Sequence, residues 1–187
     1  MIHNKSRKIN LEVTIEEMRN FSFAYIEKYA PSKQQLRTYL LKKYLTSSRT
    51  TVKKEDITNL IDIVINDLEK TQFISDKFYS ESKAKNLVQR GSSLNKIRSY
   101  LFQKGINDKY INEAILKIKE NNNDQDFFSA IKLCKKRRIG PCREEDNRPL
   151  FYKKDISILA RSGFDFEISK RVMDLEKDDY NKIINLL

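Results

Sequence analysis

The feature that most constrains the fold is a short amphipathic segment that recurs three times along the chain. The copies are RTYLLKKY (37–44), RSYLFQKG (98–105) and SILARSG (157–163). Their central leucines, Leu40, Leu101 and Leu159, are 61 and 58 residues apart. A period near 60 residues exceeds that of the common two-helix repeats and fits three helices per unit. Because three small helices bury little core on their own, each unit should pack on its neighbours, and the array should be elongated.

Apolar residues follow helical spacing through most of the chain, which predicts an all-α fold. The clearest stripe consists of Ile57, Leu60, Ile61, Val64, Ile65 and Leu68. Two capping boxes, Thr14–Glu17 and Ser32–Gln35, predict helix starts, and Pro31 ends the first helix at about Tyr29. Only four glycines and three prolines occur in 187 residues, far too few for the many tight turns of an all-β protein.

Caps and stops divide the predicted helices into three units after an N-terminal tail. Asp76, Asn107 and Asp165 are candidate helix caps, and Gly91, Gly105 and Gly163 are candidate helix ends. The predicted division is a tail at 1–13, then units at 14–71, 72–123 and 124–187, the last with a loop at about 139–150. In the third unit the predicted helix carries Ile156, Leu159 and Ala160 on its apolar side.

The chain carries a net charge of +11, which favours polyanionic partners, above all nucleic acid. A lysine-rich and asparagine-rich composition offers an equally weighted explanation, so the placement of the charge must decide. Residues 71–123 hold ten basic and five acidic residues, whereas residues 150–187 hold seven of each.

Few residues suit enzymatic or metal chemistry. Cys134 and Cys142 are the only cysteines and His3 is the only histidine, too few for a zinc site with four ligands. A buried apolar role is expected for Cys134 and a loop position for Cys142. The carboxylates Glu55, Asp56, Asp62 and Asp67 have no histidine beside them and are expected to be solvated. We therefore predict no enzymatic activity and no cofactor. No apolar run is long enough to span a membrane, and the N-terminus lacks a secretory core, so a cytoplasmic location is expected.

Residues 73–106 resemble the most recognisable segment of the RecX family, regulators of the bacterial recombinase RecA. The matching features are Phe73-Ile74, Asp76, Tyr79-Ser80, Arg90-Gly91, Lys96-Ile97, Leu101 and Lys104-Gly105-Ile106. Ser75 departs from the family, which usually has a second acidic residue there. The AIKLCKKRRIGPCR segment is similar to the family's C-terminal unit, and its IGP-containing loop looks like the α-proteobacterial branch.

This resemblance implies a function that composition does not reveal. RecX proteins bind the RecA filament on single-stranded DNA, lie along its groove, and inhibit its ATPase and strand exchange in DNA repair, recombination and the SOS response. The resemblance thus implies that this chain regulates RecA and is not an enzyme. Nothing in the sequence resembles a dimer seam, so a monomer is expected.

Two basic helix faces in the second unit are candidate binding surfaces. The first face comprises Lys83, Asn86 and Arg90, and the second comprises Lys96, Tyr100 and Lys104, which combines cations with an aromatic ring. The run Lys135, Lys136, Arg137 and Arg138 is a third candidate. Its position at a helix end equally suits a stabilising interaction with the helix dipole.

A DNA-binding transcription regulator is the alternative function. In this hypothesis residues 94–104 and 107–119 form a helix-turn-helix, and Asn107, Asp108 and Lys109 read bases. The acidic Asp108 fits poorly against phosphate, and a repeated unit suits a spacer better than a single recognition helix.

An elongated helical array has a measurable signature in solution. Circular dichroism should show helix with negligible sheet. Small-angle scattering should give a radius of gyration well above the roughly 16 Å of a compact globule of this length. A compact value would remove the elongated array from consideration.

Overall fold

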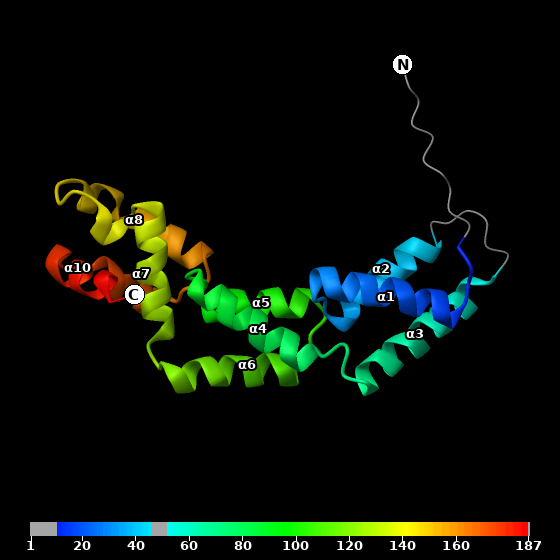
Figure 1. Ribbon diagram of the computed structural model, residues 1–187. Coiled ribbons are helices and arrows are strands. Elements are labelled where there is room, and N and C mark those ends of the chain that lie inside the picture. Colours follow the sequence, from blue (N-terminus) through cyan, green and yellow to red (C-terminus); the bar gives the residue numbers. More distant parts are fainter. Residues whose placement is uncertain (1–10, 46–51, 187) are drawn as a thin grey trace, which may run out of the picture. The chain divides into compact units, whose positions relative to one another are not determined.

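The computed structural model describes residues 11–45 and 52–186, and these residues form helices and connecting turns without any β-strand (Figure 1). The elements are α1 (Ile15–Tyr29), α2 (Lys33–Leu45), α3 (Lys54–Lys70), α4 (Asp76–Gln89), α5 (Leu94–Gln103), α6 (Asp108–Asn121), α7 (Gln125–Arg137), the 3₁₀ turn η1 (Gly140–Cys142), α8 (Asn147–Arg161), α9 (Phe166–Met173) and α10 (Lys177–Asn185). The all-α prediction is confirmed. His3, most of the predicted tail and the TSSRTT segment lie outside the described residues.

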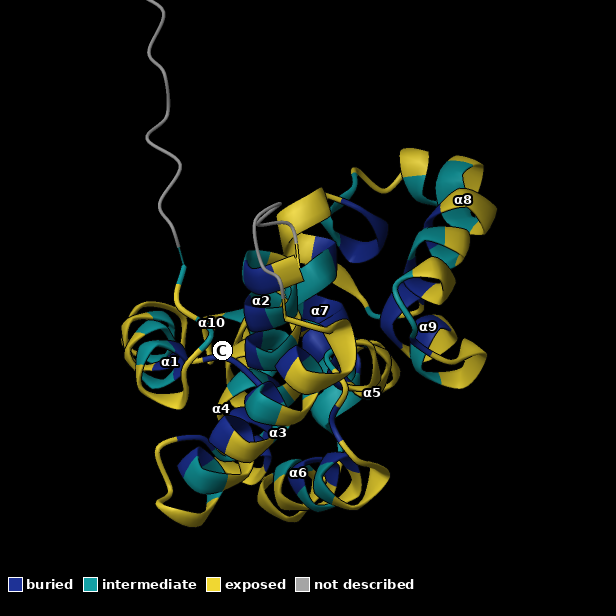
Figure 2. Cartoon of the chain, turned by 90° about the vertical axis from the view of Figure 1, so that its right-hand side faces the viewer, coloured by how far each residue is buried: buried dark blue, intermediate teal, exposed yellow. Residues whose placement is uncertain are grey.

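The chain divides into two compact units, Met1–Tyr79 and Ser80–Leu187, and the division falls inside α4. We use "triplet" for the three-helix groups α1–α3, α4–α6 and α7–α9, with α10 added to the third. The residue boundaries predicted for the triplets stay predictions. Along the helices, buried residues gather on one side and exposed residues on the other (Figure 2).

The first triplet forms its core from the predicted stripe of α3. Ile57, Ile61, Val64 and Leu68 are buried with Met18 of α1 and with Leu36, Leu40 and Tyr44 of α2. Two half-exposed ion pairs fasten α3 to its partners. Arg37 Nε donates to Asp62 Oδ1 at 2.7 Å, and Arg19 Nη2 donates to Asp67 Oδ2 at 2.5 Å. Asp62 and Asp67 remain partly exposed to solvent, as predicted, and in addition pair with arginines of α2 and α1, which the sequence did not predict.

Both predicted capping boxes begin helices. The amide of Glu17 donates to Thr14 Oγ1 at 3.2 Å. At the start of α2 the pair is reciprocal: the Gln35 amide donates to Ser32 Oγ at 3.2 Å, and the Ser32 amide donates to Gln35 Oε1 at 3.0 Å. Asn107 and Asp165 also cap their helices as predicted, by accepting from the amides of Lys109 and Ile168.

Asp76 does not cap α4, so that prediction was wrong. Ser75 takes the role, with its hydroxyl accepting from the Phe78 amide at 3.3 Å. Asp76 is the first residue of α4, and its carboxylate instead accepts from the amide of Lys33, the first residue of α2, at 2.9 Å. A helix N-terminus has unpaired amides and a partial positive charge, so it attracts a carboxylate from outside the helix. Burial raises the pKa of Asp76, and the bond from Lys33 offsets only part of that rise.

An equivalent bond occurs within the second compact unit. Asp126, in the first turn of α7, accepts from the amide of Leu94, the first residue of α5, at 2.8 Å. The same end of α5 also contacts the turn after α8, where Ser93 Oγ donates to the Ser162 carbonyl at 2.8 Å. The middle helices α2 and α5 thus both start against a carboxylate from the first turn of the helix that opens the next triplet.

The third triplet has its own core, built around Ile131, Cys134, Leu159 and Val172. Its long loop is shorter than the predicted 139–150, because α8 already starts at Asn147. Pro149 lies in the first turn of α8, where a helix tolerates proline because that amide would have no partner. Ala160, predicted on the apolar side of this helix, is exposed.

One buried carboxylate holds the connection between α7 and α8. Asp155 accepts from Arg143 at 2.6 and 2.9 Å and from the Gly140 amide at 2.9 Å. Burial by itself raises the pKa of Asp155, but the hydrogen bonds from Arg143 and Gly140 outweigh burial and lower it. The carboxylate therefore stabilises the folded chain in its ionised form.

Replacing Asp155 with Asn should destabilise the chain by about 2 kcal/mol at neutral pH, because the bonds to Arg143 lose their ionic partner. A lowered pKa means that this stabilisation is present above the ordinary value of 3.8 and is lost as the pH falls through the folded-state pKa. The difference between the two proteins in urea unfolding should therefore shrink below about pH 4. Asp179→Asn, at an exposed ion pair with Lys182, is the control and should have almost no effect. An Asp155→Asn variant as stable as the parent would contradict this role.

Candidate partner-binding surface

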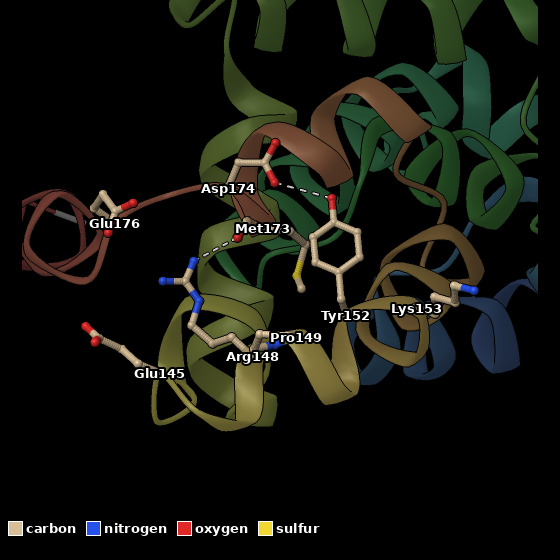
Figure 3. A pocket seen from close by; sticks show the side chains of 8 residues that line it. All are labelled: Glu145, Arg148, Pro149, Tyr152, Lys153, Met173, Asp174 and Glu176. Carbon is tan, nitrogen blue, oxygen red and sulfur yellow. Dashed lines mark hydrogen bonds between the residues drawn. The ribbon is translucent and has the colours of Figure 1, made fainter.

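A hollow lies between α8 and the end of α9 (Figure 3). Its polar side chains bind one another and the backbone. Arg148 donates to the carbonyls of Met173 and Leu175 at 2.9 and 2.6 Å, and the Tyr152 hydroxyl donates to Asp174 at 3.3 Å. Arg148 thereby pairs carbonyls at the C-terminal end of α9 that the helix leaves unpaired. The hollow is a packing contact between α8 and α9, and its lining residues include no activated nucleophile.

The two cysteines serve the third core. Both are free thiols; Cys134 is buried as predicted, and burial raises its pKa to about 12, which keeps it protonated and unreactive. Cys142 lies in η1, half-buried, and its thiol donates to the Tyr180 hydroxyl at 2.9 Å.

No group of His, Cys, Asp and Glu side chains among the residues that the structure describes could hold a metal ion. In the same residues, no helix is long and apolar enough to cross a membrane.

The first predicted face lies on the second half of α4. Asn86 and Arg90 are exposed and Lys83 is half-buried. Arg90 follows the last residue of α4 and precedes Gly91, whose φ of +77° turns the chain toward α5. The structure therefore places Arg90 at a turn between two helices rather than on a helix flank.

The second predicted face lies on α5. Lys96 is exposed, and Tyr100 and Lys104 are half-buried. The Lys104 ammonium lies 5.3 Å from the centre of the Tyr100 ring, which confirms that these two side chains share one side of the helix. Lys96 stands at the other end of α5, near the contacts that this end makes with α7 and with the turn after α8.

The third candidate is exposed throughout. Lys135, Lys136 and Arg137 form the last turn of α7, and Arg138 takes a left-handed conformation with φ of +54°. Cations in a last turn also interact favourably with the helix dipole, so both predicted roles remain compatible with this position.

The turn that follows the first candidate face packs on α7, the helix whose last turn carries the third candidate run. A Cβ on Gly91 would lie only 3.0 Å from the Cβ of Lys132 and 3.1 Å from the Ser129 carbonyl, so the turn after α4 packs directly on α7. Lys136 lies one turn beyond Lys132 on α7. We use the name joint surface for the cations on the segments that meet here and on the start of α5: Arg90, Lys96, Lys132 and Lys136.

Sequence reasoning missed Lys132. The signal was present, because Lys132 and Lys136 are four residues apart and share a helix side. Of the ten predicted residues, Arg90, Lys96 and Lys136 belong to the joint surface, whereas the structure offers no such grouping for Arg137 and Arg138.

Asn107, one of the residues that would read bases in the helix-turn-helix hypothesis, has a structural role instead. The side-chain oxygen of Asn107 accepts from the Lys109 amide at 2.9 Å and so caps α6. That oxygen is therefore engaged by the helix start, where a recognition helix would need it for a base edge.

Comparisons with known proteins agree with one another, although no family model matches the chain. Regulatory protein RecX of Myxococcus xanthus is 27% identical over 163 residues, which cover 84% of each chain. Regulatory protein RecX of Clostridioides difficile is 34% identical over 130 residues, which cover 66% of this chain and 57% of the relative. A crystal structure of regulatory protein RecX matches with a TM-score of 0.61 at 18% identity, over 86% of this chain and 74% of the other.

The described residues form an all-helical chain of three-helix groups, and this fold matches that of a regulatory protein of known structure. In sequence and in fold, the chain is therefore similar to regulatory proteins of the RecX family.

The joint surface depends on the close packing of Gly91, which gives a test. Gly91→Ala should destabilise the chain by about 2 kcal/mol, because alanine is strained at positive φ and its Cβ meets Lys132. Gly105 has a similar φ of +74° but is exposed, so Gly105→Ala should cost only about 1 kcal/mol. Thermal unfolding of both variants measures the difference. Equal losses would show that the contact with α7 adds nothing.

Proposed function

We propose that this chain binds the RecA filament on single-stranded DNA and inhibits RecA ATPase and strand exchange. Similarity to regulatory proteins named RecX supports the regulatory role, and the resemblance of residues 73–106 to the RecX family supports RecA as the target. The observation that carries the proposal is the joint surface. Its Arg90 and Lys96 lie in the segment that most resembles the family, and its Lys132 and Lys136 lie on α7, against which the turn after α4 packs.

The physical role of this surface is to meet the negative charge of the filament. Each lysine or arginine that pairs with a DNA phosphate releases a condensed counterion, so binding should weaken steeply as salt rises. Cations on three helices with fixed mutual packing present a rigid pattern, which lowers the entropy lost on binding. Lys83, Asn86, Tyr100 and Lys104 extend this surface along α4 and α5.

We further propose that the chain acts as a monomer in the cytoplasm and needs no cofactor. Placement in the α-proteobacterial branch depends only on the IGP-containing loop and stays a prediction. Within this loop, the Gly140 amide donates a hydrogen bond to Asp155, and Gly140 has a φ of +57°, a backbone conformation that favours glycine.

Added to RecA on single-stranded DNA, the chain should slow ATP hydrolysis at less than one copy per RecA protomer and should hydrolyse no ATP itself. Replacing Arg90, Lys96, Lys132 and Lys136 together with Ala should remove most of the inhibition and flatten its dependence on salt. Because all four side chains lie at the surface or half-buried, the melting temperature should change little.

A matched variant separates a specific surface from net charge. Lys53, Lys54, Lys70 and Lys77 are exposed cations of the first compact unit, and their replacement by Ala removes the same charge. This control should keep most of the inhibition. Equal losses from both variants would mean that net charge alone matters, and an ATPase unaffected by the parent chain would refute the proposed function.

A further inference from the structure

A row of aromatic rings follows the seam between α1 and α2 in the first compact unit, away in sequence from the joint surface. Tyr25 of α1 stacks on Tyr39 of α2 with ring centres 4.1 Å apart and ring planes 9° apart. Tyr29, one turn further along α1, lies 4.8 Å from Tyr25. Phe21, one turn before Tyr25, continues the row in the other direction.

Lysines lie on these rings. The Lys43 ammonium is 3.7 Å from the centre of the Phe21 ring and 5.9 Å from that of Tyr39, and the Lys28 ammonium is 5.2 Å from the centre of Tyr29. Three cations of this unit outside the seam have carboxylate partners: Arg19, Lys33 and Arg37 pair with Asp67, Glu69 and Asp62. The seam therefore combines positive charge with aromatic faces.

The core of the first triplet buries these rings only in part. Phe21, Tyr25 and Tyr39 pack their inner edges on the buried cluster of the first triplet and remain partly accessible, and 53% of Tyr29 is exposed. Leucine would fill such a seam without polar atoms, whereas a tyrosine has an apolar ring and a polar hydroxyl, which suits a partly exposed position. The row ends in the exposed ring of Tyr29, on which another flat group can stack.

We propose that this seam binds single-stranded nucleic acid, with an unpaired base stacked on Tyr29 and phosphates held by Lys28 and Lys43. Stacking on an aromatic side chain tolerates any base because every base has a π-face, and nearby cations follow the phosphate chain. The site acts on free single strands, so it does not depend on binding to RecA or on the joint surface. The cations interleaved with the rings favour a ligand that carries both flat bases and phosphates over a purely apolar partner.

Fluorescence provides a direct reading of the stack. The chain has nine tyrosines and no tryptophan, so its intrinsic emission comes from tyrosine. Titration with a short oligothymidylate should quench this emission, and the anisotropy of a dye-labelled strand should rise with the same midpoint. Tyr29→Ala should weaken binding about tenfold, whereas Tyr29→Phe keeps the ring and should bind like the parent.

Two controls separate stacking from charge and from general aromatic loss. Phe166 is an exposed ring of α9, 62% accessible, so Phe166→Ala removes an aromatic side chain outside the seam and should bind like the parent. A strand with abasic sites keeps its phosphates but lacks bases. It should bind more weakly to the parent chain and should not distinguish Tyr29→Ala from the parent.

Three results would overturn the site: no binding of free single strands, no effect of Tyr29→Ala, or an equal loss for Tyr29→Phe and Tyr29→Ala. Lys43→Gln should weaken binding and reduce its salt dependence, and an unchanged affinity would equally count against the site. RecA inhibition, measured in parallel, reports separately on the proposed function.

Discussion

A carboxylate placed against the first amide of a neighbouring helix is the interaction on which the repeat depends. Asp76 binds the start of α2, and Asp126 binds the start of α5. Both carboxylates come from the first turn of the helix that opens the next triplet, so each bond links consecutive triplets and pairs an amide that the helix leaves open. Burial raises the pKa of both groups, so ionisation opposes the fold slightly as the pH rises through those values. These two hydrogen bonds therefore fix how the neighbouring helices are placed and add little to the net stability of the fold.

Close packing at the second of these links determines where the functional residues gather. Gly91 and Gly163 both take positive φ values and lie against backbone or Cβ atoms of the neighbouring triplet, which leaves no room for a side chain. The turns they form carry Arg90 and Arg161 beside them, and α7 contributes Lys132. A surface of this kind belongs to the contact between two triplets, so neither triplet alone contains it. The proposed binding through this surface would therefore depend on correct packing of the two triplets.

Much of the fold could be predicted from the sequence because its signals are local. The apolar stripe of α3, the capping boxes at Thr14 and Ser32, and the glycines that end α4 and α5 depend on residues within one or two helical turns. The contacts that the sequence did not predict depend on distant partners. Asp76 could not be assigned to Lys33, 43 residues away, nor Asp62 to Arg37, because no local pattern records which helix packs on which. Lys132 joined the candidate surface only when the structure placed Gly91 against it.

Hydrogen–deuterium exchange of the chain, alone and on a RecA filament assembled on single-stranded DNA, tests the central claim most directly. Binding through the contact between the second and third triplets predicts slower exchange in the peptides that contain Arg90–Lys96 and Lys132–Lys136. The outer part of α8 around Leu150, which is 77% exposed, should exchange at the same rate in both states. Protection confined to α8 and α10, with unchanged exchange around Gly91, would contradict the account.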